Sequence, residues 1–150
     1  MTSEIRSRLS VLVVDDALQV RAHLRAVLSE EAGLCLVAEA ENGAGAVDSF
    51  FRCRPDVVLL DVCLPDSNGF ELMQCFKQAA PDCAVIVLSD APDPCVEEVS
   101  RLLGATEVCH KADKLRRVRE VLRRLVRERG TEMADAQGRG LAARGLPPGQ

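Results

Sequence analysis

The feature that most constrains the fold of this chain is a regular alternation of short apolar runs with amphipathic stretches. Five runs of strand length recur along the chain: Val11–Val14, Leu34–Ala38, Val57–Leu60, Ala84–Leu88 and Thr106–Cys109. The first, third and fourth runs are continuously apolar, which is typical of strands that are covered on both faces in a parallel sheet. We therefore expect five buried strands separated by longer connecting segments.

The connecting segments carry apolar residues every three or four positions, the spacing of one helical face. The five apolar stripes are Val20, Leu24, Val27 and Leu28; Val47, Phe50 and Phe51; Phe70, Met73 and Phe76; Val96, Val99, Leu102 and Leu103; and Leu115, Val118, Val121, Leu122 and Leu125. The last helix is predicted to begin after Asp113, a good N-cap residue, and to end at Gly130. Because strand and helix alternate five times, the sequence predicts an α/β fold with a doubly wound, five-stranded parallel sheet.

The length of 150 residues suits one domain. We expect an N-terminal extension over 1–8, the folded domain over 9–129 and a flexible tail over 130–150, where glycines and prolines replace the helical periodicity. No apolar run approaches the roughly 20 residues that span a bilayer, and the first ten residues lack a signal-peptide stretch. These features predict a cytoplasmic protein with no membrane contact.

Seven cysteines raise the question of disulfides or a zinc site. No two of them lie closer than eight residues, so the chain has no C-x-x-C pair, and it has only two histidines. Most lie inside apolar segments, where a free cysteine behaves as a small apolar residue. We therefore expect reduced thiols.

The net charge of −4 conceals an uneven distribution. Residues 1–112 carry 9 basic and 18 acidic side chains, a balance of −9, whereas residues 113–129 carry 8 basic and 3 acidic side chains, a balance of +5. A basic helix on an acidic body favours a protein partner or a self-complementary contact. We do not expect nucleic acid as a partner, because it requires a broad basic face.

Polar residues follow four of the predicted strands. Asp15 and Asp16 follow the first, Asp61 the third, Ser89 the fourth and Lys111 the fifth. In a parallel sheet the carboxyl ends of the strands share one edge, so these side chains are expected to meet. Carboxylates repel one another by about 4 kcal/mol per pair at 4 Å and an effective dielectric of about 20, so a proton or a cation must lie among them.

Oxygen ligands with room for water suit Mg²⁺, and a lysine and a hydroxyl suit the remaining charge of a phosphoryl group. The set therefore indicates phosphoryl transfer to a carboxylate. Taken singly, each residue also has a structural interpretation as a helix cap, a turn residue or a solvated charge. A haloacid-type phosphatase would need a second aspartate two positions after Asp61, where the chain has Cys63. The sequence Asn42–Ala46 lacks the third glycine of a dinucleotide-binding loop.

Residues 9–129 closely resemble the response-regulator receivers of two-component signalling. The matching stretches are VLVVDD at 11–16, PDVVLLDVCLPDSNGFEL at 55–72, VIVLSDA at 85–91 and GATEVCHK at 104–111. The resemblance implies a flavodoxin-like (βα)5 receiver fold and a stand-alone signalling switch, which is not an enzyme beyond its own phosphorylation and dephosphorylation.

The resemblance also implies a role for each strand-end residue. Asp61 is then the phosphoacceptor and a metal ligand, Asp16 the principal metal carboxylate and Asp15 a neighbour that holds Mg²⁺ through water. Cys63 would offer its backbone carbonyl to the metal. Ser89 would be the switch hydroxyl and Lys111 the partner of the phosphate.

Three positions depart from the common receiver pattern. Ala112 replaces the usual proline after the lysine, Val108 replaces the inward-turning aromatic residue, and Cys63 stands where a polar residue is frequent. Val108 puts the usual coupling between the hydroxyl and the aromatic residue in doubt, and Cys63 is positioned to influence how water reaches the phosphoryl group.

The partners implied are a sensor histidine kinase and an unidentified target protein. Two alternatives stay open: a phosphorelay shuttle that passes the group to a histidine phosphotransfer protein, and the receiver part of a DNA-binding regulator. A phosphorylation-dependent homodimer is also expected, through the fourth and fifth predicted helices. The fourth begins with acidic Asp90, Asp93, Glu97 and Glu98; the fifth carries basic Lys114, Arg116, Arg117, Arg119, Arg123 and Arg124.

Overall fold

A computed structural model of the protein describes residues 8–90, 93–113 and 115–144, with side chains as far as residue 136. The strands are β1 (Leu9–Val14), β2 (Leu34–Ala40), β3 (Val57–Asp61), β4 (Ala84–Ser89) and β5 (Glu107–His110). The helices are α2 (Leu18–Glu30), α3 (Gly43–Cys53), α4 (Gly69–Ala79), α5 (Pro94–Leu102) and α6 (Arg116–Arg144), with a 3₁₀ turn, η1 (Lys111–Asp113), before α6. None of the described helices has both the length and the apolar character needed to cross a bilayer.

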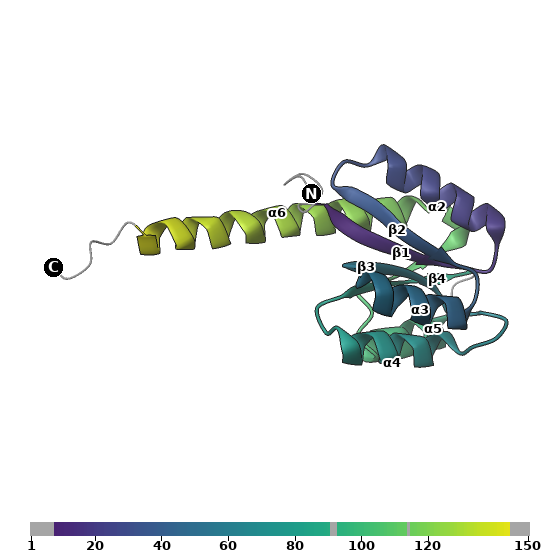
Figure 1. Ribbon diagram of the computed structural model, residues 1–150. Coiled ribbons are helices and arrows are strands. Elements are labelled where there is room, and N and C mark those ends of the chain that lie inside the picture. Colours follow the sequence, from purple (N-terminus) through teal and green to yellow (C-terminus); the bar gives the residue numbers. More distant parts are fainter. Residues whose placement is uncertain (1–7, 91–92, 114, 145–150) are drawn as a thin grey trace.

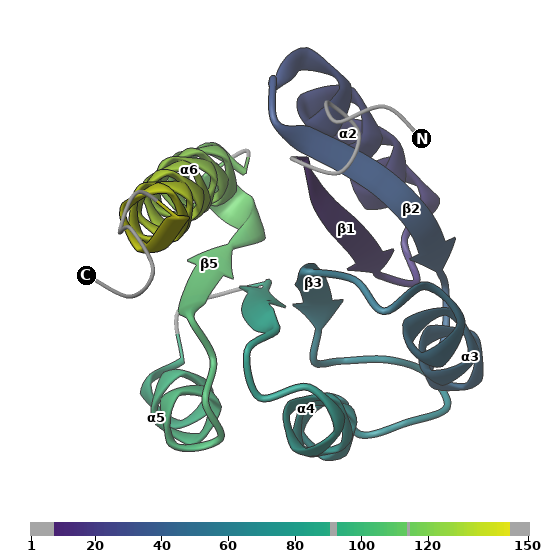
Figure 2. The same ribbon diagram turned by 60° about the vertical axis from the view of Figure 1, so that its left-hand side comes forward.

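The five strands form one parallel sheet in the order β2-β1-β3-β4-β5. Helices α2 and α6 cover one face, and α3, α4 and α5 cover the other (Figures 1 and 2). The predicted doubly wound α/β fold is therefore confirmed. The order reverses at β1, so the carboxyl ends of β1 and β3 lie side by side where such folds bind their ligands.

Two apolar clusters hold the layers together, and successive residues of a strand contribute to opposite ones. Val11 and Leu59 pack with α2 and α6, whereas their neighbours Leu12 and Leu60 pack with α3 and α4. All five residues of β3 are buried. This two-sided burial is the reason that the central strands are continuously apolar in sequence.

The start of the last helix differs from the prediction. Lys111–Asp113 form a 3₁₀ turn and α6 begins at Arg116, so Asp113 is not its N-cap. Leu115 instead adopts a left-handed φ of 63° and packs into the core, 3% exposed. Burying a leucine contributes about 1.5–3 kcal/mol, more than the roughly 1 kcal/mol of a typical N-cap. Lys114 lies outside the described residues.

The end of that helix also differs. Helix α6 runs through Gly130 to Arg144, so the predicted end at Gly130 is wrong, and Figure 1 shows its second half projecting beyond the sheet. Glycine costs a helix only about 1 kcal/mol relative to alanine, which is too little to end one. The domain limits and the flexibility expected over 130–150 stay predictions; residues 1–7 and 145–150 lie outside the described residues.

Helix α5 buries only part of its predicted apolar stripe. Val99 and Leu102 were expected in its buried stripe, but they are 38% and 79% exposed. The fully buried residue of α5 is Ser100, between the partly buried Val96 and Leu103. Because α5 packs beside β5, the edge strand, only one narrow side of the helix meets the core.

Candidate functional site

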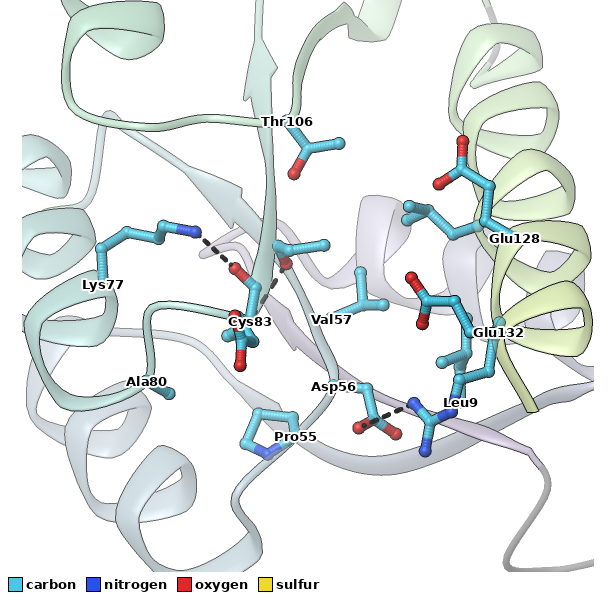
Figure 3. A pocket seen from close by; sticks show the side chains of 14 residues that line it. Leu9, Pro55, Asp56, Val57, Lys77, Ala80, Cys83, Thr106, Glu128 and Glu132 are labelled. Atoms are coloured by element: carbon cyan, nitrogen blue, oxygen red, sulfur yellow. Dashed lines mark hydrogen bonds and ion pairs between the residues drawn. The ribbon is translucent and has the colours of Figure 1, made fainter. Parts of the chain in front are cut away.

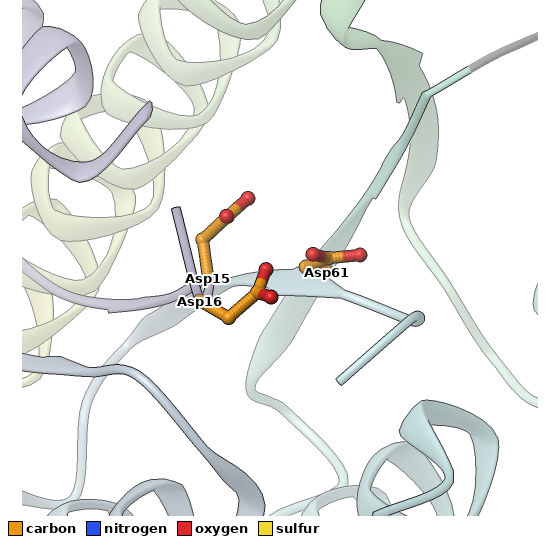
Figure 4. Close-up of side chains that lie close together, drawn as sticks. All are labelled: Asp15, Asp16 and Asp61. Carbon is orange, nitrogen blue, oxygen red and sulfur yellow. The ribbon is translucent and has the colours of Figure 1, made fainter. Parts of the chain in front are cut away.

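Three carboxylates converge at the carboxyl ends of β1 and β3 (Figure 4). Asp61 ends β3, and Asp15 and Asp16 follow β1 directly. One oxygen of each lies within 4.8 Å of the others. Asp15 and Asp61 are 0% and 3% exposed, whereas Asp16 is open to solvent. The structure thus brings together the three acidic residues selected from the sequence.

Each buried carboxylate is held by the backbone two residues further along the chain. The N–H of Ala17 donates to Asp15 Oδ1 at 2.8 Å, and the N–H of Cys63 donates to Asp61 Oδ1 at 2.9 Å. The second oxygen of each is therefore left for other partners. Among the described residues, no donor makes a hydrogen bond of good geometry to the buried Oδ2 of Asp15.

Lys111 supplies the cation of this cluster. Its Nζ lies 2.6 Å from Asp15 Oδ2, 3.2 Å from Asp61 Oδ2 and 3.6 Å from Asp90 Oδ1. One lysine thus faces Asp15, Asp61 and Asp90, with Asp16 next to them, which leaves an excess of negative charge. The sequence assigned Asp90 to the acidic start of a helix; its contact with Lys111 was missed, because a strand-end position alone does not say which way a side chain turns.

Burial and like charge raise the pKa of Asp61 above its ordinary value. The loss of solvent is the larger cause and the Asp15 carboxylate adds to it, against the Cys63 N–H and the Lys111 charge, which lower it. Burial by itself would lower the pKa of Lys111, but contact with Asp15 and the charge of Asp61 outweigh it, so the pKa is raised. Lys111 is thereby held in its charged form.

Cys63 is exposed, yet it is not an activated thiol. The pKa of its thiol is raised, and the largest cause is the partial loss of solvent around the sulfur. The charges of Asp61 and Asp90 are the next causes. A reactive cysteine requires the opposite shift, so a redox role for this side chain has no support. All seven cysteines are free in the structure, and their reduced state stays a prediction.

Ser89 completes the set at the neighbouring strand. It is the last residue of β4 and is 8% exposed, beside β3 in the sheet. The residues contributed by β1, β3, β4 and the segment after β5 therefore share one edge of the sheet, as the parallel topology requires.

Two hydrogen bonds to Asp66, which the sequence did not predict, fix the loop after Asp61. The Asp66 carboxylate accepts the N–H groups of Gly43 and Ala44 at 2.7 and 3.3 Å, at the start of α3. The Gly43 N–H is the main cause of a lowered pKa at Asp66. A Cβ at Gly43 would overlap the Ser67 side chain, and one at Gly69 would overlap the Val62 backbone. The turn-forming residues at 65–69 are the sequence feature that could have indicated an ordered turn here.

The donor set fits a small divalent cation. The available ligands are carboxylate oxygens, of which the buried Asp15 Oδ2 has the Lys111 ion pair but no hydrogen bond of good geometry among the described residues, and Asp16 keeps the cluster open to water. Mg²⁺ prefers one or two carboxylates together with water or phosphate oxygens. A divalent charge would also offset the carboxylates that Lys111 does not neutralise.

A groove of about 740 Å³ lies at the opposite, amino end of the sheet, beside α6 (Figure 3). Its Asp56 carboxylate accepts the N–H and hydroxyl of Ser10 at 2.9 and 3.1 Å, and Arg129 lies 3.4 Å away. Lys77 donates to the carbonyl oxygens of Pro81 and Cys83, each at 2.8 Å. These charged groups hold α6 and a loop against the sheet.

The basic residues of α6 are partly neutralised within the chain. Arg119 pairs with Glu30 and Glu31 at 3.0 and 2.7 Å, and Arg123 pairs with Glu31 at 2.8 Å. These contacts join α6 to α2, on the side away from α5 (Figure 2). Exposed Arg116 has no ion pair among the described residues. The basic surface available to a partner is therefore smaller than the sequence suggests.

The chain resembles known proteins over most of its length. The family model of the response regulator receiver domain matches residues 11–123. A protein-glutamate methylesterase/protein-glutamine glutaminase 5 of Myxococcus xanthus is 34% identical over 110 residues, 73% of this chain and 32% of that protein. The chemotaxis protein CheY of Thermotoga maritima is 34% identical over 79 residues, 53% of this chain and 65% of CheY.

Among solved structures, the response regulator domain of Thermotoga maritima CheB superposes with a TM-score of 0.71 at 26% identity, over 81% of this chain and 95% of that domain. The matched part of the chain spans only between a fifth and a third of the methylesterases, at 20% and 32% of two of them. The match thus covers only a part of each of those longer proteins.

Proposed function

The chain belongs to the response regulator receiver family of two-component signalling, and from this premise we propose that it is a switch phosphorylated on Asp61. A sensor histidine kinase supplies the phosphoryl group, and the phosphorylated chain signals by binding a protein target. The observation that carries the proposal is the arrangement of Asp61, buried, with a raised pKa, 3.2 Å from Lys111 and beside two further carboxylates. Such receivers are switches, and the enzymes that contain them act through other domains.

The proposed step is a phosphoryl transfer between a histidine and Asp61. An oxygen of Asp61 forms a bond to phosphorus while the phosphorus–nitrogen bond to the donor imidazole breaks, and its electron pair stays on the imidazole. The Cys63 N–H holds Oδ1 of Asp61 in place, which leaves Oδ2 on the side of Lys111. Lys111 then offsets charge on the transferred group, and the Ser89 hydroxyl serves as a donor to it.

Mg²⁺ is the proposed cofactor. Asp16, Asp61 and the backbone carbonyl of Cys63 would hold it, with Asp15 bound through water. When bound, the ion supplies positive charge for the phosphoryl oxygens, which a single lysine cannot do beside several carboxylates.

The test is intact-mass spectrometry after incubation with a small phosphodonor and Mg²⁺. We expect one phosphoryl adduct on the wild-type chain and none on Asp61→Asn, because an amide is a poor nucleophile. An adduct that survives in Asp61→Asn would move the acceptor elsewhere. No adduct on the wild-type chain with any donor would contradict the proposal.

Cys63 is the side chain proposed to set the lifetime of the phosphorylated state. It is exposed and follows Asp61 by two residues. We expect Cys63→Asn to speed dephosphorylation by positioning water, and Cys63→Arg to slow it by covering the phosphorus. Mg²⁺ affinity should change little, because only the backbone carbonyl is offered to the metal. Equal dephosphorylation rates in the three proteins would remove the side chain from this role.

The output of the switch is proposed as a protein contact that includes a phosphorylation-dependent homodimer through α5 and α6. Exposed Arg116 on α6, with Glu98 on α5, supports a charged contact of this kind. Sedimentation of the phosphorylated chain at low salt tests it, with Arg116→Glu as the variant; a monomer under these conditions would exclude the dimer. Phosphoryl transfer to a histidine phosphotransfer protein would favour the relay alternative, and a DNA-binding domain in the full coding sequence would favour the other.

A further inference from the structure

Asp90 lies beside Lys111, the cation of the site. Its Oδ1 is 3.6 Å from Lys111 Nζ, and its side chain is 78% exposed. The other two carboxylates on this lysine are buried: the side chains of Asp15 and Asp61 are 0% and 5% exposed. Lys111 is 14% exposed. Asp90 is therefore on the solvent side of the lysine, where a ligand of Lys111 would approach.

Asp90 also lies at the end of the strand next to the one that carries Asp61. Asp90 follows β4 and Asp61 ends β3, and Lys111 Nζ lies 3.2 Å from Asp61 Oδ2 and 3.6 Å from Asp90 Oδ1. A phosphodonor that reaches Asp61 and Lys111 must therefore pass close to the Asp90 carboxylate.

We propose that Asp90 is a specificity-determining residue that discriminates against phosphodonors of high negative charge. The inference rests on the proposed function, because it concerns the donor to Asp61. Asp90 offsets part of the positive charge of Lys111, and it repels an anionic donor at the solvent-exposed side of the site. Donors whose phosphoryl charge is partly compensated, as in a phosphorylated nitrogen that carries a proton, are then favoured over doubly charged acyl phosphates.

The size of the effect follows from elementary electrostatics. One additional unit of negative charge on the donor, roughly 5 Å from a carboxylate in a water-like dielectric, changes a rate by about fourfold. Because Asp90 is exposed, salt screens this repulsion, with a Debye length of roughly 8–10 Å at moderate ionic strength. The discrimination should thus be clear at low salt and weaken as salt is added.

Two small donors that differ by one unit of charge provide the probe. With doubly charged acetyl phosphate, the Asp61 oxygen–phosphorus bond forms as the phosphorus–oxygen bond to acetate breaks, and the electron pair leaves with acetate. With singly charged, zwitterionic phosphoramidate, the phosphorus–nitrogen bond breaks and its electron pair leaves with ammonia. Both reactions give the same phosphorylated Asp61, so the ratio of their rates isolates the donor.

The experiment measures that ratio by intact-mass time courses of the full chain with Mg²⁺ at low and high salt. We expect Asp90→Asn to raise the acetyl phosphate rate about fourfold relative to the phosphoramidate rate at low salt, and by less at high salt. Asp90→Glu should keep the wild-type ratio. Asp82→Asn is the matched control, since it removes the same charge from an exposed site at the amino end of the sheet.

The outcomes separate the two claims. A ratio in Asp90→Asn equal to that of the wild type, or an equal change in Asp82→Asn, would overturn the role of Asp90 while leaving Asp61 as the acceptor. Slower reaction with both donors at an unchanged ratio would make Asp90 a positioning residue for Lys111 and would also overturn the inference. Failure of both donors on the wild-type chain would overturn the proposed function and this inference together.

Discussion

The two ends of the sheet each hold an aspartate beside a cation, but the surroundings of the two aspartates differ. At the amino end, Asp56 accepts two hydrogen bonds from Ser10 and pairs with Arg129. At the carboxyl end, buried Asp61 shares one lysine with Asp15 and Asp90. A carboxylate that does not share its hydrogen-bond donors and cation with other carboxylates forms a structural contact. One that shares a single cation with other carboxylates remains available to a ligand.

The two lysines of these ends make the same distinction. Lys77 donates to two backbone carbonyl oxygens that belong to one loop. Lys111 meets only carboxylates among the described residues. Neutral carbonyls fix a lysine in one place, whereas an excess of carboxylates leaves room for an added phosphoryl group or metal ion.

The largest expected effect compares these lysines. Lys111→Ala should slow phosphorylation of Asp61 by about 100-fold, since removal of a preorganised positive group from a reacting centre costs about 10²–10³ in rate. Lys77→Ala should leave the rate within about twofold, because it is at the other end of the sheet. Intact-mass time courses with Mg²⁺ and one donor give both rates. Equal losses in the two variants would mean that the ends do not differ in chemistry.

The second prediction concerns metal. Mg²⁺ at ten times its dissociation constant should stabilise the wild-type chain by about 1.4 kcal/mol against thermal unfolding. Asp16→Asn should lose most of this gain, because it removes a ligand. Asp56→Asn should keep the gain although its own stability is lower. The comparison fails if Mg²⁺ stabilises Asp16→Asn as strongly as it stabilises Asp56→Asn.

The third prediction uses pH without metal. The pKa of Asp61 is raised in the folded chain, so its ionised form lowers stability above that pKa, and the loss is relieved as pH falls through it. Asp61→Asn should therefore be more stable than the wild type at neutral pH, by the order of 1 kcal/mol or about 2–4 °C in Tm. This advantage should shrink in acid. A variant less stable than the wild type at neutral pH would contradict the repulsion inferred among the carboxylates at the carboxyl end of the sheet.

The smallest effect is expected at the amino end. The Asp56–Arg129 pair is partly exposed, with side chains 33% and 35% accessible, so Arg129→Gln should cost no more than about 1 kcal/mol. Its phosphorylation rate should equal that of the wild type. Thermal unfolding and the mass assay give both values, and a loss of phosphorylation in this variant would show that the two ends are coupled.

Much of the site was accessible from the sequence because its residues follow strands. Asp15, Asp16, Asp61, Ser89 and Lys111 were selected by position alone, and a parallel sheet brings the ends of its strands to one edge whatever the side-chain details. Asp66 and Asp90 were not assigned to the site. Their roles depend on which N–H or ammonium group each carboxylate faces, and no periodicity records that direction.

The helices show the same division. Apolar spacing predicted where they occur, but it was wrong for Val99 and Leu102 on α5 and for both ends of α6. The face depends on α5 meeting an edge strand, and the start of α6 depends on the burial of Leu115. Both are properties of the packed core and are absent from local sequence.

The sequence by itself determined the α/β fold and the reactive edge, because an alternation of buried strands and amphipathic helices permits few arrangements and places strand ends together. Tertiary structure alone decided how charge is shared. Two arginines of α6, Arg119 and Arg123, bind Glu30 and Glu31, 88 to 92 residues away in the chain, and Lys111 meets Asp90 as well as Asp61. Ion pairs depend on distance in space, and only the folded chain sets those distances.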